Sequence, residues 1–336
     1  MRTALVALVS LGVAAPVHAQ TARLSGDVFD VIPPSERVSG ERGAMRIIQS
    51  GCRVGPTDWA RRRIVDVAVQ EWAFFGFQTV DARPVEAGRL PDGVVPDALN
   101  PRRPAPRQVR HMLRFGDWED RERVTDTVAG YWSATPDGAE VIGDQNREWR
   151  RTDRPIDWVQ PWSAAFISWV MCEGGLGDMS QFARHISHRV YIDHAIQARD
   201  GQAPDAAFVA HDAGEAEIQP GDLLCNARGS ASYRSLADRR RESGEYAPLH
   251  CDIVVRVDAE AALFHMIGGN VMNSVTLTIL PGVRDGDHLR PLAEDDLDGA
   301  RTMFAHMKLR APPIEPNALD ATPTIRAMNS LTGDLQ

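Results

Sequence analysis

The sequence predicts an α+β fold, because segments with helical periodicity come first along the chain and segments with strand periodicity follow. The apolar period changes from about three and a half to two after Pro220. Helices are expected at residues 61–77, 116–132, 160–173 and 186–198. Short antiparallel strands are expected at residues 222–226, 251–257, 263–267 and 274–279.

The first twenty residues have the pattern of a secretory signal peptide. A basic residue, Arg2, is followed by an apolar run over 3–15 and by small residues that suit cleavage after Ala19. An uncleaved membrane anchor is the alternative, but the apolar run is short for a bilayer span. We expect a periplasmic or secreted protein with a signal peptide at 1–19 and no stable membrane insertion after cleavage.

The length of the rest of the chain suits one enlarged domain or two small ones. The chain has 336 residues and a formal net charge of −9, which argues against nucleic acid as a partner. We expect a loose N-terminal segment, a single domain, a proline- and arginine-rich insertion within it, and a C-terminal tail. Their expected bounds are 20–42, 43–310, 82–109 and 311–336.

Four cysteines lie beyond the signal peptide, which permits two disulfides in an exported protein. Buried free thiols are the alternative. Cys225 and Cys251 fall on expected neighbouring strands, so we expect them to approach closely. A bond between Cys52 and Cys172 is also considered.

The most informative stretch surrounds Ser163. Pro161 is at a favoured first position of a helix, and Trp162 begins an apolar face at helical spacing. Ser163 then falls in the first turn, where free backbone N–H groups and the positive end of the helix dipole meet. A serine there is either a nucleophile or an ordinary first-turn residue.

This stretch resembles the nucleophile helix of the CHAP and NlpC-type amidohydrolases, which are papain-like enzymes that cut bacterial cell-wall peptides. Those families carry a cysteine where this chain has Ser163. The strand that begins at His250 resembles their strand with the catalytic base, and the segment around Asn270 resembles the region that orients that base. The whole pattern is similar to the bacterial family catalogued as domain of unknown function 2272, and it implies a papain-like α+β fold.

The resemblance implies Ser163 as nucleophile, His250 as base and Asn270 as the residue that orients the base. A serine needs such a base because its hydroxyl is a far weaker acid than a thiol. Asp252 shares a strand face with His250 and is a weaker candidate for the orienting role. Cys251 is a rival nucleophile, but it points away from its neighbour His250.

His188 and Tyr191 are candidate substrate-binding residues, because the resemblance places the 186–198 helix beside the cleft. Trp162 is a candidate because its ring could stack on a ligand. The alternative for His188 and Tyr191 is an exposed helix face, and for Trp162 a place in the core. Trp158 is the tryptophan expected to be exposed. No cofactor is implied, and the histidine spacing does not favour a metal site.

The sequence therefore predicts an exported papain-like hydrolase, with the Ser163 N–H and a donor near Gln160 or Asp157 meeting the oxyanion. The resemblance implies a cell-wall peptide or a related amide as substrate. The alternative is a catalytically silent papain-like fold that binds cell-wall peptide or a protein partner.

Overall fold

The computed structural model describes residues 22–86, 95–96, 108–113, 116–152, 157–229, 231–286, 288–296 and 301–333. The expected signal peptide at 1–19 and most of the expected 82–109 insertion lie outside these residues. The helices are η1 (Pro34–Arg37), α1 (Thr57–Phe74), α2 (Glu122–Trp132), α3 (Gly138–Arg151), α4 (Ser163–Glu173), α5 (His188–Arg199), α6 (Leu236–Arg241), η3 (Ala318–Ala321) and α7 (Pro323–Gly333).

Most strands belong to one mixed sheet of ten strands, and β1 pairs with β2 in a separate antiparallel pair. Along the large sheet the order is β4-β5-β3-β10-β9-β8-β7-β12-β6, with β11 paired to β10. Only β3 and β10 run parallel among the described pairs. The strands are β1 (Val38–Ser39), β2 (Arg46–Ile47), β3 (Thr79–Glu86), β4 (Val95–Pro96), β5 (Gln108–Leu113), β6 (Phe208–His211), β7 (Leu223–Ala227), β8 (Leu249–Asp258), β9 (Leu263–Val271), β10 (Ser274–Asp285), β11 (His288–Pro291) and β12 (Met303–Leu309).

The α+β class is confirmed, and the four expected helices and four expected strands are present as α1, α2, α4, α5, β7, β8, β9 and β10. The sheet is larger than expected, because six of its strands were not recognised: β3, β4, β5, β6, β11 and β12. β3 carries Arg83 and Pro84, which do not favour a strand. α3 was missed because its sequence is mostly polar and its apolar residues are few.

The segments at the two ends have more structure than expected. The 20–42 segment was expected to be loose, but its Arg37 is fully buried and its Phe29 and Val31 join the core. The 311–336 tail contains η3 and α7, and Leu319 of η3 packs into the core. The C-terminal segment packs on α1 through η3 and α7, and the N-terminal segment contacts α4 through Arg37 and Glu173. Both contacts remove helix surface from water.

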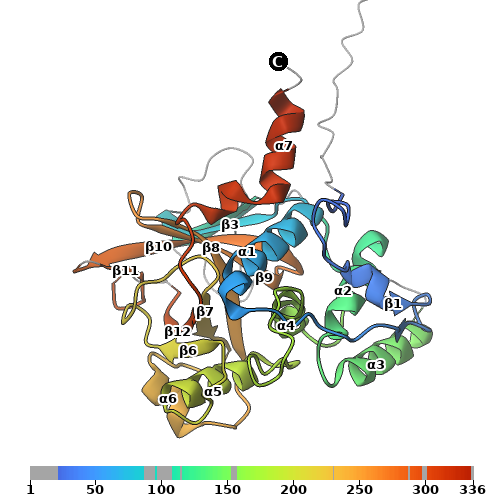
Figure 1. Ribbon diagram of the computed structural model, residues 1–336, viewed down its shortest axis with the longest axis horizontal. Coiled ribbons are helices and arrows are strands. Elements are labelled where there is room, and N and C mark those ends of the chain that lie inside the picture. Colours follow the sequence, from blue (N-terminus) through green and yellow to red (C-terminus); the bar gives the residue numbers. More distant parts are fainter. Residues whose placement is uncertain are drawn as a thin grey trace, which may run out of the picture.

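α4 lies at the centre of the molecule (Figure 1). It packs against β8 and β9 on one side and against α1 and α2 on the other, and every residue of it is buried. A helix that is apolar all round is expected in such a position. Gly269 of β9 permits the close approach, because a Cβ at that position would overlap the side chain of Phe166 on α4.

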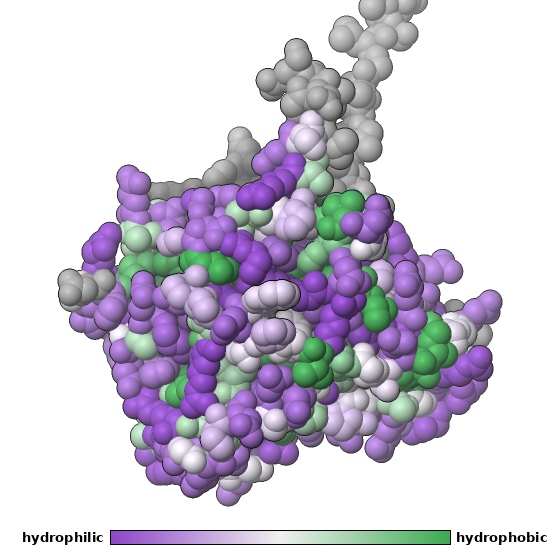
Figure 2. Space-filling model, in the orientation of Figure 1, coloured by the Kyte–Doolittle hydropathy of each residue, from purple (hydrophilic) through white to green (hydrophobic). Residues whose placement is uncertain are grey.

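The helices of the described residues do not meet the requirements of a membrane span. Among the described residues, no helix combines the length and the apolar character that a bilayer crossing requires. The face in Figure 2 is mostly hydrophilic, with small separate hydrophobic patches.

Both considered disulfides are present. Cys225 of β7 stands directly opposite Cys251 of β8 in the sheet and is bonded to it, which confirms the expected close approach. Cys52 is bonded to Cys172 near the end of α4 across a separation of 120 residues, whereas the first bond spans only 26. The longer bond therefore attaches the chain just before α1 to the central helix α4.

The two disulfides should contribute unequally to stability. In the chain-entropy account, a bond that closes the longer loop restricts the unfolded chain more, by about 5 kcal/mol against about 3.5 kcal/mol for the shorter loop. We expect replacement of Cys52 and Cys172 by alanine to lower the free energy of unfolding more than replacement of Cys225 and Cys251. Urea denaturation of both variants measures the difference. Titration of the unreduced, denatured protein should find no free thiol, and four free thiols would contradict both bonds.

Candidate active site

Ser163 is the first residue of α4, and its hydroxyl contacts a histidine from another helix. The N-cap is Trp162, whose side chain makes no capping hydrogen bond, so the N–H groups of the first turn are not capped by it. Ser163 Oγ lies 2.7 Å from Nε2 of His188, the first residue of α5. The hydroxyl is therefore in contact with an imidazole nitrogen at the positive end of a helix.

His188 is fixed at both ring nitrogens. Its Nδ1 contacts the hydroxyl of Tyr191, one turn further along α5. Burial lowers the pKa of His188 well below its usual value, and the neighbouring His250 lowers it further, while the charge of Asp252 acts in the opposite direction. His188 is therefore neutral near pH 7, so one of its nitrogens donates and the other accepts. If Nδ1–H donates to Tyr191, Nε2 can accept the proton of Ser163.

His250 is paired with a carboxylate on its own strand. Its Nε2 lies 2.7 Å from Oδ1 of Asp252, two residues along β8. Burial also lowers the pKa of His250, so the neutral ring donates its Nε2–H to the carboxylate and Nδ1 is left as an acceptor. This Nδ1 is buried and has no hydrogen-bond partner among the described residues.

Asp252 carries a buried negative charge that acts on both imidazoles. Burial by itself raises its pKa, but the charges of His250 and Arg301 and the His250 hydrogen bond outweigh this and lower the pKa to about 2. Nη1 of Arg301 lies 3.4 Å from Oδ2 of Asp252. The rings of His188 and His250 are adjacent, with centroids 5.1 Å apart.

The structure brings together Ser163, His188, Tyr191, His250 and Asp252, a different set from the one expected. Ser163 contacts His188 in place of His250. His250 is oriented by Asp252 in place of Asn270, which has no hydrogen bond to the ring among the described residues. Asn270 lies near the end of β9 with a φ of 55°, in the left-handed region that asparagine tolerates in turns. These contacts differ from those expected for His188, Asp252 and Asn270, whose roles stay predictions.

The tryptophans before α4 are core residues. Trp162, expected to bind substrate, is fully buried and stacks on Phe75 and Tyr131. Its Nε1 donates to Glu119 at 2.5 Å, and the other oxygen of Glu119 accepts from the backbone N–H of Trp158. Trp158 was expected to be exposed and is instead buried. Glu119 thus fixes the backbone immediately before Ser163.

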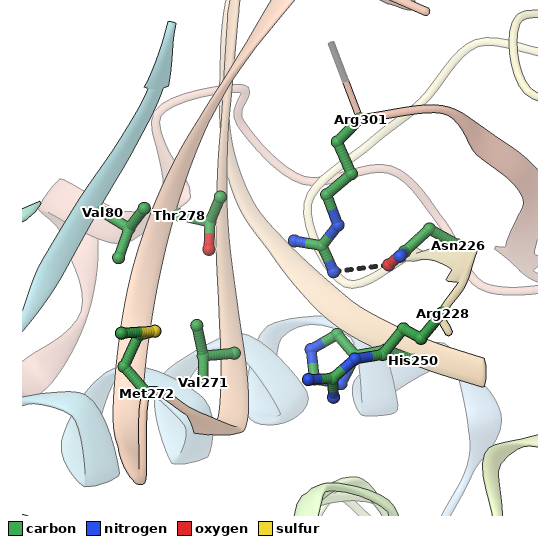
Figure 3. A pocket seen from close by; sticks show the side chains of 8 residues that line it. All are labelled: Val80, Asn226, Arg228, His250, Val271, Met272, Thr278 and Arg301. Carbon is green, nitrogen blue, oxygen red and sulfur yellow. Dashed lines mark hydrogen bonds between the residues drawn. The ribbon is translucent and has the colours of Figure 1, made fainter. Parts of the chain in front are cut away.

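A pocket of about 290 Å³ opens beside His250 (Figure 3). One side is polar, with Arg228 and Arg301, and the opposite side is mostly apolar. Its lining residues are Val80, Asn226, Arg228, His250, Val271, Met272, Thr278 and Arg301. Ser163 is not among them and is only 4% exposed, so the hydroxyl lies behind the pocket wall in this structure. Within the described residues no cluster of His, Cys, Asp or Glu is arranged to hold a metal ion.

One of the missed contacts was readable from the sequence. His250 and Asp252 share a strand face by simple alternation, so their pairing follows once the strand is recognised. The contact of His188 with Ser163 has no such signal, because it depends on how α4 and α5 are both placed on β8, which local sequence does not determine.

The fold and this site define an α+β protein with a serine at the start of a buried helix, two adjacent imidazoles and a buried carboxylate. A family model described as an uncharacterized protein conserved in bacteria, domain of unknown function 2272, matches residues 119–309. The chain belongs to this bacterial family, as the sequence predicted. Neither the curated proteins nor the solved structures contain a match to the chain.

The buried His188 should change how the stability of the protein depends on pH. The pKa of His188 is lower in the folded state than in the unfolded chain, so its stabilising contribution is complete above about pH 6.5 and is lost as the pH falls below that value. Each such group changes the free energy of unfolding by at most about 1.4 kcal/mol per pH unit. Asp66, with a pKa raised to about 7 by burial, acts with the opposite sign.

A comparison with His188→Gln separates the contribution of His188 from that of Asp66. Between pH 7.5 and 5.5 the wild type should lose more stability than His188→Gln, because the variant lacks the buried imidazole. Urea unfolding at a series of pH values measures both slopes. Equal slopes would mean that the His188 pKa is not lowered in the folded protein.

Proposed function

We propose that this protein is a papain-like hydrolase of amide bonds in cell-wall peptides, with Ser163 as nucleophile. The observation that carries the proposal is the 2.7 Å contact between Ser163 Oγ and His188 Nε2 at the start of α4. A serine nucleophile requires an adjacent base, and this contact supplies one. The papain-like assignment is supported by the order of elements, with the nucleophile on a helix and a histidine on a strand of the following antiparallel sheet.

In this proposal His188 Nε2 takes the proton of Ser163 as the oxygen attacks a substrate carbonyl. The His188 ring that becomes charged is stabilised by the nearby carboxylate of Asp252, and Tyr191 accepts from Nδ1. N–H groups of the first turn of α4 face the developing oxyanion. The protonated His188 then returns its proton to the leaving amine, and water releases the acyl group by the reverse sequence.

The His250–Asp252 pair is a second base beside the first. Its Nδ1 is an unpartnered acceptor, and its Asp252 partner holds the ring in one tautomer. His250 would become the base in place of His188 if the Ser163 side chain changed rotamer toward it. The family resemblance favours His250 in this role, whereas the observed contact favours His188.

We also propose export to the periplasm or the cell exterior. Two disulfides account for all four cysteines, and such bonds persist in oxidising compartments. The pattern of residues 1–19 supports the same location.

A catalytically silent protein that binds cell-wall peptide is the second candidate. The specific observation in its favour is the burial of Ser163, whose hydroxyl has almost no exposure and does not line the pocket. A substrate carbonyl would reach it only after movement of neighbouring side chains. The pocket itself is open to a ligand without that movement.

Hydrolysis of purified peptidoglycan separates the two candidates. Release of soluble fragments by the wild type should fall by at least about a hundredfold in Ser163→Ala and in His188→Gln, because each removes a partner in proton transfer. His194→Gln is the matched control, since His194 lies on the same helix α5 outside the site. Equal release by wild type and Ser163→Ala would reject Ser163 as nucleophile and favour the silent candidate.

Replacement of Ser163 by cysteine tests the site without a substrate. Because the native cysteines are all in disulfides, Ser163→Cys introduces the only free thiol. A thiol at a helix start beside an imidazole should ionise readily and react with iodoacetamide faster than an ordinary thiol near pH 7. Adding His188→Gln or His250→Gln identifies the base, because only loss of that ring should remove the advantage. A rate that neither replacement changes would contradict a poised site.

A further inference from the structure

We propose that the pocket beside His250 binds the terminal carboxylate of a short peptide together with a small apolar side chain. The pocket has a cationic side, an apolar side and two unpartnered polar atoms, and each of these features points to the same kind of ligand. The site can be assigned from the pocket alone, and only the identification of the ligand with the substrate rests on the proposed function.

The cationic side contrasts with a protein whose net charge is −9. Arg228 follows β7, is exposed, and has no carboxylate within ion-pair distance among the described residues. Arg301 is held by Oδ2 of Asp252 and by Oδ1 of Asn226. Figure 3 shows both guanidinium groups on the same side of the pocket. Arg228 therefore offers its guanidinium group to an anion, beside the guanidinium group of Arg301.

The opposite side fits a small apolar group. Val80 of β3, Val271 of β9 and Met272 after it line that side (Figure 3). A free phosphate or sulfate would leave this apolar surface unused, whereas a residue such as alanine beside a carboxylate would cover it. A volume of about 290 Å³ accommodates about one or two small residues of a peptide.

Two buried polar atoms of the lining have no partner among the described residues. They are Oγ1 of Thr278, which is 2% exposed, and Nδ1 of His250, which is 1% exposed. Unpaired buried polar groups are costly, so a ligand that supplies hydrogen-bond partners gains affinity by satisfying them. Peptide N–H and C=O groups provide both a donor for Nδ1 and an acceptor for the threonine hydroxyl.

The pocket adjoins the proposed catalytic groups at one point. His250 lines the pocket, and its ring is adjacent to that of His188, which contacts Ser163. A peptide anchored by its carboxylate at Arg228 would therefore direct its preceding amide toward the two imidazoles. This assigns the substrate class as an acyl peptide with a free carboxylate close to the bond that is cut.

The test measures binding of N-acetyl-alanyl-alanine and of its C-terminal primary amide by isothermal titration calorimetry. Ser163→Ala serves as the parent protein so that turnover does not interfere. We expect the free acid to bind at least about tenfold more tightly than the amide, since charge-assisted hydrogen bonds to a carboxylate supply about that difference. Adding Arg228→Gln should remove the preference.

Arg147→Gln is the control, because Arg147 is an exposed arginine on α3 and its loss changes the net charge equally. It should leave the preference unchanged. The proposal is overturned if acid and amide bind equally, if neither binds, or if Arg147→Gln has the same effect as Arg228→Gln. It is also overturned if inorganic phosphate binds as tightly as the acid, since the apolar side would then contribute nothing.

The outcomes also separate this proposal from the proposed function. Selective binding that depends on Arg228, in a protein that releases nothing from peptidoglycan, would support the pocket and reject hydrolysis. Release of fragments that depends on Ser163, without any preference for the acid, would support hydrolysis and reject the pocket.

Discussion

The buried carboxylate of Asp252 is the constraint on which the site depends. An ionised group without water must be compensated by hydrogen bonds and opposite charge, or its pKa rises until it is neutral. Here His250 and Arg301 provide that compensation, and each also lines the pocket. The position of the carboxylate therefore fixes both the orientation of the His250 ring and the place of the Arg301 guanidinium group. If either group moved away, the buried charge of Asp252 would lose part of its compensation.

Close packing of β9 against Asp252 and against α4 explains why positions 268 and 269 are glycines. A Cβ at Gly268 would overlap Oδ1 of Asp252, and a Cβ at Gly269 would overlap Phe166 of α4. β9 can therefore approach both the charged pair and the central helix only because these positions lack side chains. Glu119 supports the other side of the helix start by accepting from Trp162, and it thereby connects the tryptophan core to the backbone before Ser163.

The class of the fold and the elements of the site followed from periodicity and from short motifs, because those signals are local. α4 and β8 were recognised for this reason, and the face shared by His250 and Asp252 is a direct result of strand alternation. The partner of Ser163 was not predictable in the same way, since His188 and Ser163 are brought together by two helices that both pack on β8. The attachment of residues 22–42 to the core was missed because their anchor is an arginine, Arg37, whose burial depends on a distant glutamate.

Serine at the head of α4 has a consequence for how the chain acquires its disulfides. Cys172 lies near the far end of the same helix and must find Cys52 across most of the N-terminal part of the chain. A reactive thiol at position 163 would be a fifth cysteine, competing in thiol–disulfide exchange during oxidative folding and offering several incorrect pairings. It would also be open to irreversible oxidation in the same surroundings. A hydroxyl avoids both hazards, so Ser163 lets a site of this geometry mature where disulfides form.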